Sequence, residues 1–417
     1  MGRRQSLLAI CGCGNTITVL FHESRQNVAD AWLIINHQHQ GRLVAPLLVA
    51  NLRRGGIDAR LMRSSEMIIR KSMARNTGQC IPVNIVAQEF IDYVEQHGLD
   101  PEQTMLWMTK CYITCNLRLY PFYIKNLLED YGHGFEKASV YFGLLTHLEI
   151  AYSTGYYAYF AYLLGGLIRK MGCKIRPYEI RRGETEAAIQ KSIGLLETAF
   201  LGKRQIDAAV NEAVSLFDKI ERKPGTKPLV AIFGDLYVRD NDIMNQDLIH
   251  DIEENGGEVV TTPYTDLVKI TIENVIRRAL ARGDYFQAGL FRVMLASINL
   301  FEDKYYDQFK KYLGDKPVVN PERLEKNLPK FNISPYHSGE SYENILKIFY
   351  ILENYPGISL FVQTNPAFCC PAMVTEAMAQ EIKRITGIPV VTLTYDGTSG
   401  NKNEVLVSYL NSAIAGL

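Results

Sequence analysis

The sequence predicts an α/β protein with two Rossmann-like domains built on mostly parallel sheets. Short apolar runs typical of buried strands alternate with helical segments in both halves of the chain. With 417 residues, the chain is also too long for one compact core. Residues 223–228, rich in proline, glycine and lysine, are typical of a linker. We therefore expect an N-terminal tail at 1–15, a first α/β domain at 16–222 and a second at 229–417.

The predicted strands are short apolar runs, and helical segments separate most of them. In the first half we expect strands at residues 16–21, 57–62, 104–109, 137–142 and 174–180, with helices at 43–51, 83–97, 151–168 and 185–221. In the second half we expect strands at 229–233, 258–262, 358–363 and 390–394, with helices at 243–255, 265–315, 342–355 and 372–386 and a loop-rich stretch at 314–338.

The composition argues against two classes of partner. The chain has 45 basic and 45 acidic residues and no formal net charge, so we expect neither nucleic acid nor an anionic membrane surface as the main partner.

The apolar run Leu7–Ile10 is too short for the core of a signal peptide. The most apolar window, residues 151–168, holds five tyrosines and three glycines and is interpreted as a buried helix rather than a membrane span. We expect a cytoplasmic protein.

Adjacent cysteines after a predicted strand are the centre of the functional prediction. Cys369, Cys370 and Pro371 follow the apolar run at 358–363 and stand at a helix start. In an open α/β sheet, ligands bind beyond the carboxyl ends of the strands, and a helix N-terminus favours thiolate over thiol. These residues therefore stand where a cofactor would be held, although two buried thiols can also serve as small apolar side chains.

Two further cysteines occupy comparable places in the first half. Cys80 lies between a loop and a helix start, and Cys115 follows the predicted strand at 104–109. Thiolates at the strand ends of two domains can meet in the cleft between them, and iron–sulfur clusters need such soft ligands. The wide spacing differs from that of a ferredoxin motif and fits a cluster clamped between domains.

Other metal chemistry has less support in the sequence. Cys111 and Cys115 could form half of a zinc site, but no second close pair of cysteine or histidine follows. The same pair matches the start of a radical-SAM motif, except that Arg118 stands in place of the third cysteine. The other cysteines do not lie at a predicted strand end or helix start. Cys173 is expected in the core, and Cys11 and Cys13 lie in the N-terminal tail.

Polar residues in three loops are candidates for contact with a substrate. Arg239 could bind a phosphate or carboxylate, or equally be a surface arginine. His337 could act as an acid or base, although a lone histidine is more often structural, and Asp396 follows the last predicted strand. All three loops would lie near one sheet edge, although Asp-Gly and Ser-Gly pairs are also common in turns. The sequence contains no P-loop and no complete G-x-G-x-x-G motif after a strand, so nucleotide hydrolysis is not predicted.

Nine segments carry a resemblance to a known family: Asn76–Pro82 (NTGQCIP), Phe90–Asp100 (FIDYVEQHGLD), Tyr123–Leu128 (YIKNLL), Ile175–Glu179 (IRPYE), Ala231–Asn245 (AIFGDLYVRDNDIMN), Gly256–Tyr264 (GGEVVTTPY), Gly339–Lys347 (GESYENILK), Phe361–Pro371 (FVQTNPAFCCP) and Thr394–Gly397 (TYDG). In them the chain resembles the 2-hydroxyacyl-CoA dehydratase superfamily, and most of all the carboxy-terminal segment of acyl-CoA dehydratase activase-related proteins. The resemblance runs from about residue 40 to the end, and the first 40 residues fit less well.

The resemblance implies two Rossmann-like domains with an iron–sulfur cluster between them. Dehydratase subunits hold a [4Fe–4S] cluster by three cysteines, which correspond here to Cys80, Cys115 and one of Cys369 or Cys370. Relatives called double-cubane cluster proteins hold two bridged cubanes, and Cys111 would extend the ligand set toward such an [8Fe–9S] cluster. A sixth ligand would then come from one of the remaining cysteines: Cys173, Cys11 or Cys13.

The resemblance also implies a partner and a class of reaction. A separate ATP-hydrolysing activase would act in trans, because its actin-like ATP-binding domain is absent from this sequence. The chain would work as a homodimer or as a heterodimer with a related subunit. We expect a low-potential reductase or dehydratase that acts on an acyl-CoA or small unsaturated substrate. The alternatives are a non-catalytic electron-transfer subunit that carries the cluster, and a cluster-free scaffold with buried thiols.

Overall fold

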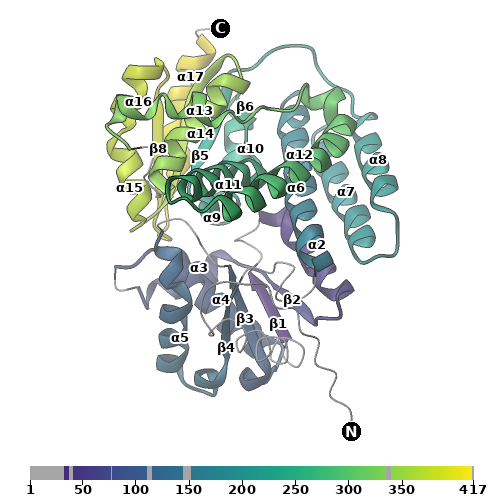
Figure 1. Cartoon of the computed structure of the whole chain (residues 1–417), viewed down its shortest axis with the longest axis vertical. Coiled ribbons are helices and arrows are strands. Elements are labelled where there is room, and N and C mark those ends of the chain that lie inside the picture. The colour runs from purple at the N-terminus through teal and green to yellow at the C-terminus, as the bar shows by residue number, and fades with distance from the viewer. Residues whose placement is uncertain are drawn as a thin grey trace.

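The computed structural model describes residues 32–36, 41–76, 78–109, 115–143, 152–334 and 340–415, and Figure 1 shows how their elements are arranged. The strand expected at 16–21 lies outside these residues, and so do four residues singled out in the sequence: Cys11, Cys13, Cys111 and His337.

The first half contains a four-stranded sheet. Its strands are β1 (Trp32–Asn36), β2 (Ala59–Met62), β3 (Thr104–Thr109) and β4 (Ser139–Gly143), in the order β2-β1-β3-β4. All of their pairings are parallel. The sequence predicts the last three strands but misses β1, whose residues WLIIN form a short apolar run without alternation. Periodicity cannot separate such a run from part of a helix.

The second half contains another parallel four-stranded sheet. Its strands are β5 (Leu229–Gly234), β6 (Glu258–Val260), β7 (Ile358–Pro366) and β8 (Val390–Tyr395), in the order β6-β5-β7-β8. All four occur where the sequence predicts them. The two central strands, β5 and β7, are almost continuously buried, as expected when helices cover both faces of a parallel sheet.

The central strands of the second sheet approach each other very closely at their carboxyl ends. Gly234 has a φ of +114°, and a Cβ atom on it would lie 2.4 Å from the carbonyl oxygen of Thr364 on β7. A side chain is excluded there by both the backbone angle and the contact, so the close approach requires glycine.

Both sheets follow one plan. In each, the chain builds a first strand, adds the second on one side of it, and then crosses to the other side for the third and fourth. The winding direction therefore reverses between β1 and β3 and again between β5 and β7. Open α/β sheets bind ligands in the crevice that such a reversal leaves at the carboxyl ends. The fold is thus α/β with parallel sheets, as the sequence predicts.

Helices surround the two sheets. The α-helices are α2 (Gly41–Arg54), α3 (Glu66–Met73), α4 (Pro82–Gln96), α5 (Tyr120–Tyr131), α6 (Tyr152–Ile175), α7 (Glu184–Phe200), α8 (Ile206–Phe217), α9 (Leu236–Arg239), α10 (Leu248–Glu254), α11 (Tyr264–Ala281), α12 (Tyr285–Leu313), α13 (Pro321–Glu325), α14 (Glu340–Asn354), α15 (Cys370–Ala377), α16 (Ala379–Thr386) and α17 (Leu406–Ala415). The 3-10 helices are η2 (Pro101–Gln103), η3 (Asn116–Leu119), η4 (Phe135–Lys137), η5 (Arg176–Tyr178), η6 (Leu328–Phe331) and η7 (Lys402–Val405).

The strand predicted at 174–180 is wrong. α6 continues to Ile175, η5 follows directly, and Glu179 forms an isolated antiparallel bridge with Arg222. The alternation of polar and apolar residues there imitates a strand. However, Ile175 lies four residues after Met171, and both are fully buried in the same core, so it extends the apolar face of the helix.

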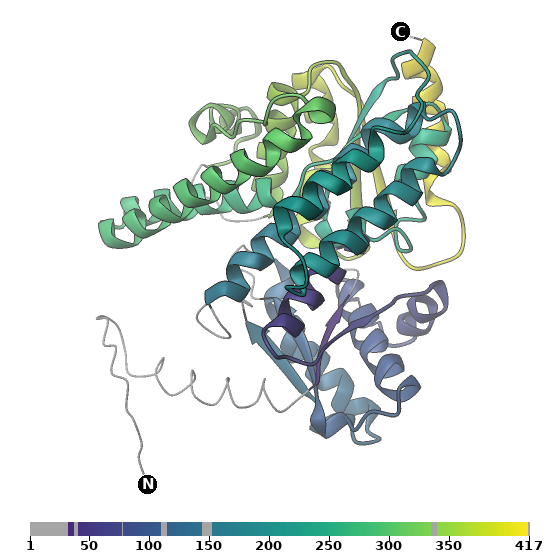
Figure 2. The same ribbon diagram turned by 90° about the vertical axis from the view of Figure 1, so that its right-hand side faces the viewer.

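A layer of helices beside the sheets forms a second core. α2, α6, α7, α8 and α12 bury their apolar faces against one another, and Figure 1 shows them grouped next to the second sheet. α6 also contacts α11 and β6, so residues of the first half pack directly on the second. α11 and α12 form a hairpin whose turn stands away from the rest of the described chain in Figure 2. No helix in the described ranges is long and apolar enough to cross a membrane.

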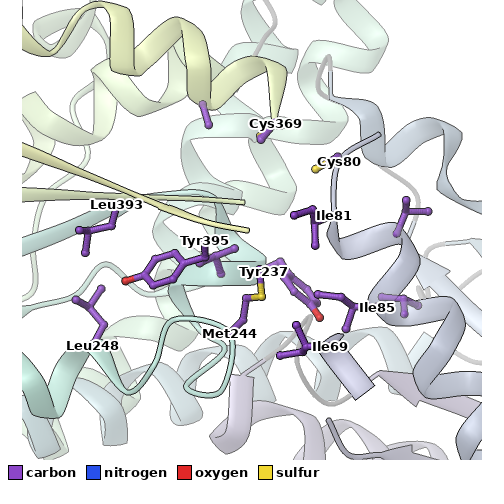
Figure 3. Packing of buried hydrophobic residues seen from close by; sticks show 14 of the residues in the cluster. Ile69, Cys80, Ile81, Ile85, Tyr237, Met244, Leu248, Cys369, Leu393 and Tyr395 are labelled. Carbon is purple, nitrogen blue, oxygen red and sulfur yellow. The ribbon is translucent and has the colours of Figure 1, made fainter. Parts of the chain in front are cut away.

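The largest core joins the two halves. It contains Ile69, Ile81 and Ile85 from the first half together with Tyr237 and Met244 from the second. Figure 3 shows these side chains facing each other across the interface. The carboxyl ends of the two sheets therefore meet over a dry contact that fixes their relative position.

Candidate cofactor site between the two sheets

Cysteine-bearing segments from both halves meet at this interface. Cys80 directly precedes the start of α4, Cys115 follows β3, and Cys369 and Cys370 follow β7. Cys80 and Cys369 belong to the core that joins the halves, and Figure 3 shows them on facing segments. Cys115 is half-buried and Cys370 is exposed. The thiols thus lie along one boundary, from its interior to its surface.

Two hydrogen bonds hold these segments together across the interface. The backbone nitrogen of Ile81 donates to the carbonyl oxygen of Ala367 at 3.3 Å. The side-chain amide of Asn116 donates to Sγ of Cys370 at 3.6 Å. The segments around Cys80 and Cys115 are therefore both neighbours of the loop that follows β7.

A hydrogen-bonded loop fixes the position of Cys80. The Asn76 side chain accepts a hydrogen bond from the nitrogen of Gly78 at 2.8 Å and donates to the carbonyl oxygen of Gln79 at 3.1 Å. Nε2 of Gln79 donates to the Tyr123 hydroxyl on α5 at 2.6 Å. The loop therefore ties Cys80 to α5 as well as to α4.

The second half presents its thiols from the start of a helix. Cys369 is the N-cap residue of α15 and Cys370 its first residue, with Pro371 in the first turn as the sequence predicts. Phe368, just before them, has a φ of +65°. This left-handed conformation is rare for a bulky residue, and strained backbone of this kind recurs at functional sites.

Two buried tyrosines lie beside the thiols. Tyr120, the first residue of α5, lies beside Cys80, and burial followed by the influence of Cys80 raises the pKa of its hydroxyl. Burial and then the charge of Glu89 raise the pKa of Tyr237 on α9. Both phenols stay protonated at neutral pH, so each can donate a hydrogen bond at the interface.

Exposed apolar side chains flank the thiols along the chain. Leu119 and Phe122 follow Cys115, and Phe368 and Met373 lie on either side of Cys370. All four side chains are exposed although they are large and apolar. Apolar side chains gathered around a polar feature are typical of a surface that contacts another molecule.

A cavity of about 380 Å³ opens on the same interface. It lies between α3 of the first half and the loops at 243–246 and 395–402 of the second. The carbonyl oxygen of Tyr395, a lining residue, accepts a hydrogen bond at 2.9 Å from Ala367, two residues before Cys369. One lining residue is thus hydrogen-bonded to the thiol-bearing loop, although no described cysteine lines the cavity itself. The volume falls within the range of small-molecule sites, about 300–1,000 Å³.

Asp396 lines this cavity, and it also shapes the loop that follows β8. Its carboxylate accepts hydrogen bonds from the nitrogen and hydroxyl of Thr398 at 3.0 and 2.7 Å and from Nζ of Lys402 at 3.2 Å. Burial alone would raise the pKa of the carboxyl group, but these hydrogen bonds and the lysine charge together lower it. Asp396 is therefore a carboxylate at neutral pH.

Arg239 lies in the interior, not at the surface. Its guanidinium donates to both carboxylate oxygens of Asp240, at 3.0 and 2.9 Å, and to the hydroxyl of Thr262 at 3.1 Å. Arg169 on α6 also bonds to Asp240, at 2.7 Å. Arg239 is thus part of an internal ion network that links α6 to α9, and its partners are protein groups.

A buried polar group next to α15 was not singled out from the sequence. Glu343 and Asn344 on α14, and Gln363 and Asn365 on β7, each have a buried side-chain atom with no hydrogen-bond partner among the described residues. The Asn344 amide donates to the hydroxyl of Thr375 on α15 at 3.3 Å, and the Gln363 amide donates to the carbonyl oxygen of Ala372 on α15 at 3.0 Å. Glu343 instead accepts a hydrogen bond from the hydroxyl of Thr271 on α11 at 3.3 Å. Buried polar atoms are nearly always paired, so we expect water or a ligand to complete them.

Glu343 is the titratable member of this group. Burial raises the pKa of its carboxyl group to about 7, and the charge of Lys347 only partly opposes this effect. The feature that could have revealed Glu343 is a helix that carries polar residues although residues 341–350 are all buried. That signal requires knowledge of burial, which the sequence does not supply.

Cys173 lies in the core, as predicted. It is almost completely buried in α6, and burial is the largest cause that raises the pKa of its thiol to about 12. Among the described residues, no three histidine, cysteine, aspartate or glutamate side chains converge on a point where a single metal ion would bind. In a cluster, by contrast, each thiolate binds a different iron, so the ligands stand apart around the group. The thiols of Cys80, Cys115 and Cys370 are of the ligand type that such a cluster requires.

Comparison with known proteins adds no relative. No protein-family model matches the sequence, and no match was found among the curated proteins. The function of the chain has therefore to be inferred from the site itself.

Proposed function

We propose that the chain holds an iron–sulfur cluster between its two halves and uses it for single-electron chemistry of the 2-hydroxyacyl-CoA dehydratase type. The meeting of the cysteine segments where the carboxyl ends of two parallel sheets face each other carries this proposal. The proposal includes two Rossmann-like domains that hold the cluster between them. Function on such a fold has to be argued from the site.

The ligands proposed for a [4Fe–4S] cluster are Cys80, Cys115 and Cys370, with Cys369 as the alternative to Cys370. With Cys111 added, the set approaches the needs of an [8Fe–9S] double cubane. When bound, the cluster would supply low-potential electron transfer. The chain would supply the hydroxyl of Tyr120, which lies beside Cys80, stays protonated and can donate toward thiolate sulfur or substrate.

The cavity beside the thiol-bearing loop favours an enzyme over a simple electron carrier. Its volume of about 380 Å³ suits the reacting part of an acyl-CoA or another small unsaturated substrate. Arg70 and Lys402 line it, and each is paired with a carboxylate, Arg70 with Glu66 at 3.5 Å and Lys402 with Asp396 at 3.2 Å. An anionic group of a substrate would replace these carboxylates as the partner of the two cations. A non-catalytic subunit that relays electrons would need no such cavity.

The exposed apolar residues beside Cys115 and Cys370 support a redox partner. An ATP-hydrolysing activase that acts in trans must bring its own redox centre close to the cluster, and Leu119, Phe122, Phe368 and Met373 offer it an apolar contact surface. Cys370 is exposed in the same region. We therefore place the activase contact at this face.

Anaerobic purification with iron and sulfide analysis tests the proposal. About four irons per chain would indicate one cubane and about eight a double cubane. We expect Cys80→Ala and Cys370→Ala to lose most of the iron, whereas Cys173→Ala, a matched loss of one thiol from the core, should keep it. Iron-free protein under strictly anaerobic conditions, with all chains folded, would refute the cluster.

A second measurement separates enzyme from electron carrier. Electron paramagnetic resonance of the reduced protein should change when an acyl-CoA enters the cavity, and Arg70→Ala should weaken that change without loss of iron. A spectrum that no acyl-CoA or small unsaturated compound alters would favour the electron-transfer subunit.

A further inference from the structure

The helical hairpin of α11 and α12 exposes one face that nothing in the described chain covers. The inner face of α12 packs on α11 through Ala288 and Ile298, which are buried with Ile276 and Ala279. The opposite face points to solvent, and Figure 2 shows that this end of the hairpin extends beyond the rest of the described structure. Among the described residues, none would obstruct a second molecule that approaches this face.

The exposed face carries an apolar stripe with regular spacing. Phe286, Leu290, Val293 and Leu300 are exposed by 79%, 59%, 66% and 72%, and the exposed Ser297 stands between the last two. We call these five residues the α12 stripe. Their spacing of four, three, four and three residues is the heptad repeat by which two helices pack against each other. A lone solvated helix has no need of this repeat.

The stripe is also almost free of charge. Between Tyr285 and Phe301, the only charged residue in the sequence is Arg292. Arg292 lies beside the stripe rather than on it, and it interacts with Glu273 of α11. The same surface on another copy can therefore face the stripe without repulsion between like charges. A helix that binds an anionic membrane would instead carry a lysine- and arginine-rich polar face.

We propose that the α12 stripe is the contact through which two copies of this chain form a dimer. In an antiparallel pair with its two-fold axis near Val293, Phe286 and Leu290 of one copy face the part of the stripe that carries Ser297 and Leu300 in the other. The small Ser297 leaves room for the larger side chains opposite. The two hairpins together form a four-helix bundle.

The exposed area agrees with this partner. An aromatic side chain offers about 150–250 Å², and Tyr285 and Phe286 are exposed by 75% and 79%. Together with the aliphatic members of the stripe, Phe286 offers an area in the range of the largest apolar patch on a typical monomer, about 300–600 Å², which often serves a function. Tyr285, which lies beside the stripe, enlarges the area that a second copy would cover. The inference does not depend on a cluster, because the hairpin contains no cysteine.

Sedimentation velocity of the full chain over a range of concentrations tests this assignment. The wild-type chain should dimerise, and Val293→Glu should raise the dimer dissociation constant by about 100-fold or more, because it buries an unpaired charge. Gln287→Glu is the matched control: it adds the same charge at an exposed position of α12 outside the stripe, and it should leave the dimer intact. Circular dichroism checks that both variants are folded.

A cross-link tests the two-fold geometry independently. Val293→Cys should give a disulfide-linked dimer under mild oxidation, because the two copies of residue 293 lie near the axis, whereas Gln287→Cys should not. A wild-type chain that stays monomeric, as it would if its own N-terminal segment covered the stripe, would overturn the proposal. A dimer that Val293→Glu does not weaken would overturn it equally.

Discussion

The close approach of β5 and β7 makes Gly234→Ala a sensitive test of the second sheet. The added Cβ would lie 2.4 Å from the carbonyl oxygen and 2.9 Å from the nitrogen of Thr364. Both atoms belong to the neighbouring backbone, so neither can move aside without disturbing the sheet. The hydrogen bond from Asp235 to the same oxygen, 2.9 Å long, would be disturbed as well.

The expected cost has two parts. Alanine at a φ near +114° costs about 1–3 kcal/mol in backbone strain, and the contact with Thr364 adds about 1–3 kcal/mol as overpacking. Gly400→Ala is a matched control, because Gly400 has a φ of +120° but no atom within 4 Å of an added Cβ. Gly400→Ala should therefore lose only the stability that corresponds to the backbone strain.

Denaturant unfolding followed by circular dichroism measures the difference. We expect Gly234→Ala to unfold at a clearly lower denaturant concentration than Gly400→Ala, and both to unfold below the wild type. Equal midpoints for the two variants would show that the contact with Thr364 contributes nothing. The reasoning about the closeness of β5 and β7 would then be wrong.

Three further changes test other parts of the structure. The pKa of Glu343 in the folded chain, about 7, lies above its ordinary value of 4.5. The free energy of unfolding should therefore fall as the pH rises from about 4.5 to about 7. Unfolding at several pH values should show that Glu343→Gln removes about 1–3 kcal/mol of that fall. Arg239→Met should lose about 1.5–3 kcal/mol of stability in urea unfolding, because it removes the hydrogen bonds of Arg239 to the largely buried Asp240, which keeps Arg169 as a partner; unchanged stability would indicate that Arg239 serves another purpose. Ile85→Ala, in the core that joins the halves, should cost about 2–5 kcal/mol, whereas Met67→Ala at an exposed site should stay within about 0.5 kcal/mol in the same assay.

The sequence predicts the strands best where an apolar run is bounded by turn residues. β5 ends at Gly234-Asp235 and β7 ends before Cys369-Cys370-Pro371, and both occur where they are expected. β1 is missed because a central strand of five residues has no alternation to mark it. The strand expected at 174–180 is wrong because the last turn of α6 imitates one.

The candidate site is predictable in kind but not in detail. Parallel strands all end at one edge, so a cysteine after a strand can be placed at that edge from the sequence alone. The bond between Ile81 and Ala367 cannot be foreseen, because it depends on how the two halves dock. The burial of Arg239 depends in the same way on Asp240 and on Arg169, which lies in a different part of the chain.

The two sides of the site that joins the halves are synthesised at different times. Asn116 and Cys370 are 254 positions apart, so during synthesis Cys80 and Cys115 leave the ribosome long before the thiols opposite them exist. Because N-terminal segments fold first, the first sheet would form with one side of the site still missing. A group that binds between the halves would therefore be inserted only after the segment around Cys370 has been synthesised. Once inserted, it would bind the docked form alone and hold the halves together, so loading and resistance to unfolding would rise in parallel.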